Sequence, residues 1–166
     1  GEAFGVAPPV RPVAAGYAMA NKLKANGAIG VVYIGDGTLG EGILYETLNI
    51  ISQWELPLLM VCENNYYAKS HPKSFSVAWD IDQRASAFDS KTDRWTTDDP
   101  EILMEKAAEA ISYVREYTKP LFFMVDTYRL NPHSKGDDDR DVSEINGYRQ
   151  KDFLDIFSKE QPAYFG

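Results

Sequence analysis

Two short polar motifs follow apolar runs closely in this sequence: Gly-Asp-Gly at 35–37 and Asn-Asn at 64–65. Glycine lets the backbone approach a ligand closely, while Asp36 and Asn65 offer side-chain oxygens. A carboxylate beside a phosphate needs a bridging cation, and Mg²⁺ binds protein oxygens together with phosphates. The two motifs together predict a site for a magnesium diphosphate.

Thr38 is expected to open a helix, because apolar residues recur at helical spacing from there to about Trp54. The free N–H groups and positive dipole end of that helix would face the phosphates. Either motif alone is common turn chemistry. The two motifs in this order are much less common than either alone, because residues 38–63 between them hold one helical pattern and one strand pattern. We therefore favour a binding site over two unrelated turns.

The wider pattern predicts the elements that must position these motifs. The expected strands are 28–34, 56–62 and 120–128. The expected helices are 12–26, 38–54, 81–88, 98–117 and 143–160, with a looser segment at 66–79. Asp98 or Asp99 would cap the helix that contains Pro100. Helices and strands thus alternate along the chain.

Strands that are almost continuously apolar and alternate with helices indicate an α/β fold. We expect an open, mostly parallel sheet with helices on both faces. No linker or internal repeat divides residues 1–166, which predicts a single domain. Ligands of such sheets bind at the carboxyl ends of the strands. Both motifs and the polar loop at His133 should therefore project from one edge.

Composition narrows the possible partners. The chain has 166 residues, is 44% hydrophobic and carries a formal charge of -8. Nucleic acid and anionic membranes both require a basic face, so neither is expected as a partner. Cys62 is the one cysteine, which excludes a disulfide within the chain. No signal peptide or membrane-spanning run is evident, and we expect a cytoplasmic protein, or a mitochondrial-matrix protein in a eukaryote.

Longer stretches of the sequence resemble a known family. The run "GDGTLGEGILYETLNIISQWELPLLMVCENNYY" resembles the thiamine diphosphate signature. It is also similar along its whole length to α subunits of 2-oxo acid dehydrogenases, the family of the pyruvate, branched-chain and acetoin dehydrogenase complexes. The later run "DTYRLNPHSKGDDDR" resembles the Tyr-Arg and His-Ser loop of that family. The resemblance extends from about Gly5 to Arg149 and implies the thiamine diphosphate-binding fold.

The resemblance implies roles for individual residues. Asp36 and Asn65 would bind Mg²⁺ through side-chain oxygens, and Tyr67 would bind it through its backbone carbonyl. The cofactor-binding residues would be Gly5, Ala7, Gly35, Asp36, Gly37, Thr38, Asn65, Arg129 and His133. Of these, the Gly5 and Ala7 backbone would touch the aminopyrimidine ring, and the guanidinium of Arg129 would pair with a phosphate. His133 falls on the catalytic histidine of the family, and imidazole suits proton handling near neutral pH.

The resemblance is not complete. Asn131 stands where mammalian mitochondrial members have a histidine, and no role is assigned to it. Ser134 corresponds to a regulated phosphorylation site in those members. Family α subunits are also much longer than 166 residues, and this sequence begins without an initiator Met. We therefore expect a partial chain that lacks the family's N-terminal portion and C-terminal tail.

The resemblance also implies partners. In this family a β subunit supplies the glutamate that activates the aminopyrimidine, so this chain would hold half of a site within a heterotetramer. A small 2-oxo acid would be decarboxylated, and its acyl group would pass to a lipoyl-bearing acyltransferase. The resemblance does not single out one 2-oxo acid.

Three alternatives stay open at this stage. A transketolase-type ketol transferase shares both motifs, although the loop after Arg129 favours the dehydrogenase branch. A noncatalytic remnant of the same fold could serve as a scaffold. A nucleotide-binding glycine loop is disfavoured, because Glu63 is followed at once by Asn-Asn and not by the arrangement that a ribose site requires.

Overall fold

The structure is a computed structural model, and it describes residues 10–68, 71–72, 81–96, 99–132 and 139–160. Its centre is a parallel sheet in the order β1-β2-β6-β5. The strands are β1 (Gly30–Gly35), β2 (Leu58–Asn64), β5 (Lys91–Thr96) and β6 (Leu121–Asp126). Within the described ranges, no helix is long and apolar enough to span a membrane.

The strand register brings the carboxyl ends of all four strands to one edge. Gly35 of β1 lies opposite Glu63, the next-to-last residue of β2. Asp126, the last residue of β6, lies opposite Asn64 on one side and Thr96 on the other. The predicted α/β fold with a parallel sheet is confirmed, and both polar motifs stand at this edge.

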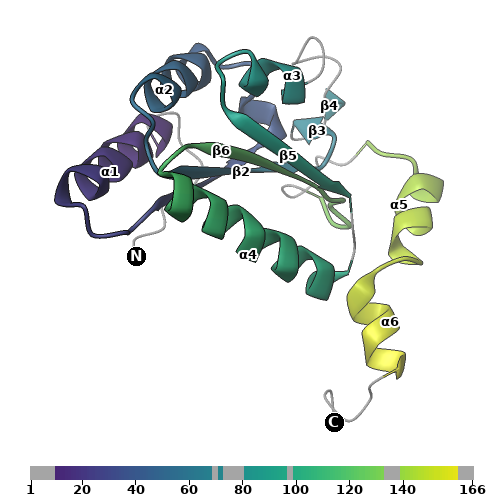
Figure 1. Ribbon diagram of the computed structural model, residues 1–166. Coiled ribbons are helices and arrows are strands. Elements are labelled where there is room, and N and C mark those ends of the chain that lie inside the picture. The colour runs from purple at the N-terminus through teal and green to yellow at the C-terminus, as the bar shows by residue number, and fades with distance from the viewer. Residues whose placement is uncertain (1–9, 69–70, 73–80, 97–98, 133–138, 161–166) are drawn as a thin grey trace.

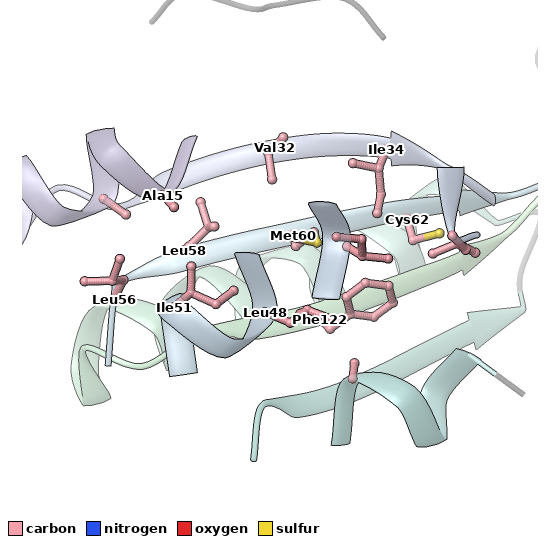
Figure 2. Close-up of a cluster of buried hydrophobic side chains, with 14 of the residues drawn as sticks. Ala15, Val32, Ile34, Leu48, Ile51, Leu56, Leu58, Met60, Cys62 and Phe122 are labelled. Atoms are coloured by element: carbon pink, nitrogen blue, oxygen red, sulfur yellow. The ribbon is translucent and has the colours of Figure 1, made fainter. Parts of the chain in front are cut away.

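Helices pack on both faces of the sheet (Figure 1). One face carries α1 (Val10–Lys24), α2 (Gly42–Gln53) and α3 (Ile81–Ser86), and the other carries α4 (Pro100–Tyr117). Figure 2 shows the larger core, in which Leu48 and Ile51 of α2 lie against Met60 and Phe122 of the sheet. The smaller core packs Ala110 and Val114 of α4 on the opposite face.

The burial of the strands follows from this layering. All but one residue of β2 are buried, because its two neighbouring strands and the helices on both faces enclose it. β1 is an edge strand, and its residues alternate between buried and exposed. Val32 and Ile34 pack into the larger core, whereas Val31 and Tyr33 are exposed on the face of α4. α4 packs on β2 and β6, and among the described residues Val31 and Tyr33 of β1 stay exposed on that side.

β5 is absent from the predicted elements. Its sequence, KTDRWT, lacks the apolar run that marked the other strands. Within the described ranges β5 pairs with β6 alone, and its residues are all exposed or half-buried. A polar edge strand carries almost no hydrophobic signal, which is why periodicity did not reveal it.

The predicted C-terminal helix at 143–160 is two helices. α5 (Val142–Arg149) and α6 (Phe153–Glu160) are separated at 150–152. The side chain of Asp152 accepts a hydrogen bond from the N–H of Leu154 at 3.0 Å. Such local bonding of an aspartate to the backbone competes with helix continuation and favours a cap. Asp99 caps α4 in the same way, accepting from Glu101 and Ile102, and resolves the choice between Asp98 and Asp99.

Candidate functional site

The Gly-Asp-Gly motif forms a short 3-10 turn directly after β1. This turn, η1 (Asp36–Thr38), is closed by a hydrogen bond from the N–H of Leu39 to the carbonyl of Asp36 at 3.1 Å. The hydroxyl of Thr38 donates to the carbonyl of Gly35 at 2.7 Å. α2 begins only at Gly42, so the prediction that Thr38 opens the helix is wrong. The reason is local, because the bonds made by Asp36 and Thr38 stabilise a separate turn first.

Residues of α2 and α3 hold the segment that follows η1. The hydroxyl of Tyr45 donates to the carbonyl of Leu39 at 2.6 Å. Arg84 donates to the same hydroxyl, and its guanidinium lies 5.7 Å from the Tyr45 ring centre. Leu39 itself is fully buried. Side chains of α2 and α3 therefore hold the residue at which the chain leaves η1.

Gly35 and Asp36 give the turn an unusual combination of open space and a buried acid. Gly35 has φ -91° and ψ 156°, which any residue adopts, so no special backbone conformation requires glycine there. In the part of the chain that the structure describes, a Cβ at Gly35 would meet no atom within 4 Å. Asp36 is 2% exposed. A buried carboxylate can supply an oxygen ligand to a cation, and the open space at Gly35 leaves room for an anion bound to that cation.

The two asparagines of the second motif have different surroundings. Asn64 is fully buried, and its Nδ2 donates to Oδ1 of Asp126 at 2.5 Å. Its carbonyl accepts from the N–H of Thr127 at 2.9 Å. Asn65 is half-buried, and its Oδ1 accepts from the N–H of Tyr67 at 3.0 Å. Asn64 therefore ties β2 to β6, and Asn65 shapes the turn beyond the sheet, with Tyr66 at φ 64°.

Asp126 is the centre of a hydrogen-bond network that sequence reasoning missed. Its carboxylate accepts from Nε of Arg94 at 2.9 Å, from Nη2 of Arg94 at 3.1 Å and from the Thr96 hydroxyl at 2.7 Å, besides Asn64. Burial by itself would raise the pKa of Asp126, but the hydrogen bonds from Arg94, Thr96 and Asn64 together lower it. The network joins the ends of β2, β5 and β6. Because β5 has no sequence signal, no pattern pointed to it.

The turn after β2 folds back towards the Gly-Asp-Gly turn. β3 (Tyr67–Ala68) pairs with β4 (His71–Pro72) and also contacts η1. The structure thus brings the segment of Asp36 and the segment of Asn65 and Tyr67 together. Among the described residues, no three His, Cys, Asp or Glu side chains gather as a metal site. A metal ion at this edge would therefore depend on amide and backbone oxygens besides Asp36.

Arg129 follows β6 by three residues and is half-buried. Its carbonyl accepts a hydrogen bond from Nη1 of Arg140, and the Arg140 guanidinium lies 5.5 Å from the Tyr67 ring centre. Arg129 is thereby linked to the turn that follows β2. Gly5, Ala7, His133 and Ser134 lie outside the described residues. Their predicted roles stay predictions.

Comparisons with known proteins show the family of the chain. A family model described as "Dehydrogenase E1 component" matches residues 5–161. The pyruvate dehydrogenase E1 component subunit alpha of Rickettsia felis is 32% identical over 151 residues, which is 89% of this chain and 46% of that protein. The alpha subunit of acetoin:2,6-dichlorophenolindophenol oxidoreductase from Cupriavidus necator is 32% identical, with 89% and 46% covered.

Two further comparisons concern a third relative and the fold. The 2-oxoisovalerate dehydrogenase subunit alpha of Bacillus subtilis is 30% identical, over 91% of this chain and 44% of that protein. The chain thus spans about half the length of the curated relatives that it matches. A solved structure, described as that of a "putative thiamin diphosphate-dependent enzyme" isolated from Mycobacterium smegmatis, matches with a TM-score of 0.55 at 22% identity, covering 72% of this chain and 22% of that one. That likeness concerns the fold alone.

Proposed function

The chain belongs to the dehydrogenase E1 component family, and from this premise we propose that it is the thiamine diphosphate-binding α component of a 2-oxo acid dehydrogenase. The observation that carries the proposal is the contact of η1 with β3 at the carboxyl edge of the sheet. This contact joins the two halves of the predicted magnesium diphosphate clamp.

Three groups on this edge would hold Mg²⁺. The buried carboxylate of Asp36 would provide a charged oxygen, and Asn65 a neutral amide oxygen. The Oδ1 of Asn65 already accepts from the N–H of Tyr67, but an amide oxygen has two lone pairs, so one is left for a metal. The same bond orients the turn of Tyr67, whose carbonyl would be the third ligand. Mg²⁺ typically takes few protein ligands and fills its octahedron with phosphate and water oxygens.

The diphosphate would lie against η1. Gly35 and Gly37 would allow close approach of the backbone, and the hydroxyl of Thr38, which already donates to Gly35, would keep the turn closed. Arg129 would pair its planar guanidinium with a phosphate. Gly5 and Ala7 would contact the aminopyrimidine, and His133 would handle a proton at the substrate. When bound, thiamine diphosphate supplies the electron sink for decarboxylation.

The proposed partners follow from the family. A β subunit would complete the site, a lipoyl-bearing acyltransferase would accept the acyl group, and a small 2-oxo acid would be the substrate. Such an enzyme would work in the cytoplasm, or in the mitochondrial matrix of a eukaryote. No observation on the described residues favours a transketolase reaction or a noncatalytic scaffold.

Calorimetric titration of the full chain with thiamine diphosphate tests the proposal, first with Mg²⁺ and then with a chelator, each alone and with a candidate β subunit. We expect saturable binding that requires Mg²⁺ and that Asp36→Asn removes. Asp89→Asn is the matched control, because Asp89 is exposed and remote in the chain from both motifs. Normal affinity of Asp36→Asn would contradict the site. Absence of binding even with the β subunit would contradict the function and favour the scaffold.

A further inference from the structure

Arg140 connects two loops that leave neighbouring strands. It is 9% exposed and lies just before α5. Its guanidinium donates from Nη1 to the carbonyl of Arg129 and from Nη2 to the carbonyl of Asn131 at 3.2 Å. One guanidinium therefore binds two carbonyls of the loop that follows β6. A planar group with several fixed N–H donors is suited to bind two carbonyls at once.

The same guanidinium also contacts two tyrosine rings. It lies 5.5 Å from the ring centre of Tyr67, in the turn after β2, and 5.2 Å from that of Tyr128, just after β6. Both distances are within the range of cation–π attraction. Tyr128 further stacks on Tyr148 of α5, with ring centres 3.7 Å apart and planes inclined by 4°. Arg140 thus contacts the Tyr67 turn through one ring, and the loop after β6 through one ring and two carbonyls.

Glu144, in the first turn of α5, completes the cluster. Its carboxylate accepts from the hydroxyl of Tyr67 at 2.9 and 3.1 Å and from the hydroxyl of Tyr128 at 3.0 Å. The two rings are therefore held at their hydroxyl ends by Glu144, and Arg140 lies near both ring centres. Figure 1 shows α5 beyond the ends of the strands, apart from the helices that cover the sheet. The cluster is what attaches this helix to the two strand-end loops.

We infer that Arg140 is a positioning residue for the cofactor site: it holds the Tyr67 turn and the Arg129 loop at a fixed separation. The roles of Tyr67 as a metal ligand and Arg129 as a diphosphate partner rest on the proposed function. The clamp itself rests on the contacts above. Without the Arg140 contacts, binding of the cofactor would have to order the two loops, and the free-energy cost of that ordering would weaken the affinity.

The contacts at position 140 require the guanidinium of arginine and not only a positive charge. Lysine at this position keeps the charge, but it loses the planar fork that reaches two carbonyls and lies against two rings. Arg140→Lys should therefore lose the positioning role and bind the cofactor more weakly. Arg115→Lys is the matched control, since Arg115 is exposed in the last turn of α4.

The test measures cofactor affinity and turnover of the chain reconstituted with its β subunit. Arg140→Lys should weaken Mg²⁺-dependent affinity for thiamine diphosphate about tenfold, while kcat at saturating cofactor changes less than about twofold. Arg140→Ala should weaken it at least as much, and millimolar guanidinium ion should restore part of the loss where methylammonium does not. Rescue by the fork-shaped ion would not follow from a general loss of folding.

The outcomes separate this inference from the function on which it rests. Wild-type affinity in Arg140→Lys, or equal rescue by both ions, would overturn the positioning role and leave the proposed function standing. Equal loss of kcat and affinity would also overturn it, because the residue would then act in the reaction itself or through general folding. Failure of the wild-type complex to bind thiamine diphosphate would overturn the proposed function, and the positioning role with it.

Discussion

Asn64 and Asn65 are adjacent in the chain, but their side chains have different tasks. Asn64 is buried and joins β2 to Asp126 of β6, whereas Asn65 organises the turn that leads to Tyr67. Side chains alternate between the two sides of a strand, so neighbours at a strand end are directed apart. A motif of two identical residues therefore contains one residue for the framework and one for the predicted ligand.

Asp126 makes the stability of this framework sensitive to acid. Its pKa is lowered in the folded protein, so its contribution is present above the unfolded value of 3.8 and is lost as pH falls through the folded pKa. We expect urea denaturation to show a fall in stability below about pH 4. Asp126→Asn should cost about 1–3 kcal/mol at neutral pH and flatten the acid dependence. Asp89→Asn should leave both unchanged.

Tyr128 should report the integrity of the Arg140 cluster at alkaline pH. Burial, followed by the hydrogen bond to Glu144, raises the pKa of Tyr128 from 10.0 to about 12. Because the neutral phenol is favoured in the fold, its contribution to stability is full below pH 10 and is lost between about 10 and about 12.

The phenolate absorbance of the wild type minus that of Tyr128→Phe isolates this titration. Glu144→Gln should move the Tyr128 pKa downward, because it removes the carboxylate that the hydroxyl meets. Glu116→Gln, an exposed change on α4, should not move it. An unshifted titration in Glu144→Gln would show that the hydrogen bond does not form in solution.

At the scale of the elements, α1 and β1 lie unusually close together. A Cβ placed on Gly30 would come within 2.8 Å of Cδ1 of Leu58, 3.3 Å of Cβ of Ala18 and 3.4 Å of the carbonyl oxygen of Ala14. Gly30, Ala14 and Ala18 are small and permit this approach of α1 to β1, whereas the nearest atom belongs to Leu58 of β2. This contact fixes the helix that precedes β1, and β1 in turn carries the Gly-Asp-Gly turn at its other end.

Gly30→Ala should therefore destabilise the protein by about 1–3 kcal/mol, because the added methyl group would overlap Leu58 of β2 and crowd the α1–β1 contact. Gly16→Ala is the matched control, since Gly16 lies in α1 and a Cβ there would meet no described atom within 4 Å. That change should stabilise the helix by about 0.5–1 kcal/mol. Chemical denaturation of both variants measures the difference. Equal stability of the two would contradict the close approach.

At the scale of the whole molecule, the helices cover the sheet unevenly. α4 packs on β2 and β6 but leaves Val31 and Tyr33 of β1 exposed, at 44% and 64% of their surface. On the opposite face, α1 and α2 bury Val32 and Ile34 in the larger core. One strand therefore has a fully packed side and an open side within the described part of the chain.

Alanine at two successive valines tests this asymmetry. Val32→Ala should cost about 2–3 kcal/mol, because Val32 is 3% exposed and its removal leaves a cavity in the larger core. Val31→Ala should cost less than about 1 kcal/mol, because that side chain is largely in water. The two variants differ only in the face that they alter. Similar losses in equilibrium unfolding would mean that the open side is covered in solution.

The sequence by itself determined the elements with a strong hydrophobic signal. β2 and β6 were predicted because a strand buried on both faces of a parallel sheet is apolar almost throughout. β1 was predicted from the same kind of apolar run, although Val31 and Tyr33 are exposed on one face. The fold class and the meeting of both motifs at one edge follow from those strands and from the spacing of 35–37 and 64–65. The family resemblance rests on the residues of the longer runs quoted above. These features are local in sequence, or follow from the general geometry of parallel sheets.

The tertiary structure alone decided what depends on partners distant in sequence. β5 is recognisable only once Arg94 and Thr96 are seen to bond Asp126, some thirty residues away. The separate environments of the two asparagines and the Arg140 cluster are decided in the same way. A polar residue has no periodic sequence signal of its own, because its contribution depends on the group with which it forms a hydrogen bond. Only the folded chain identifies that group.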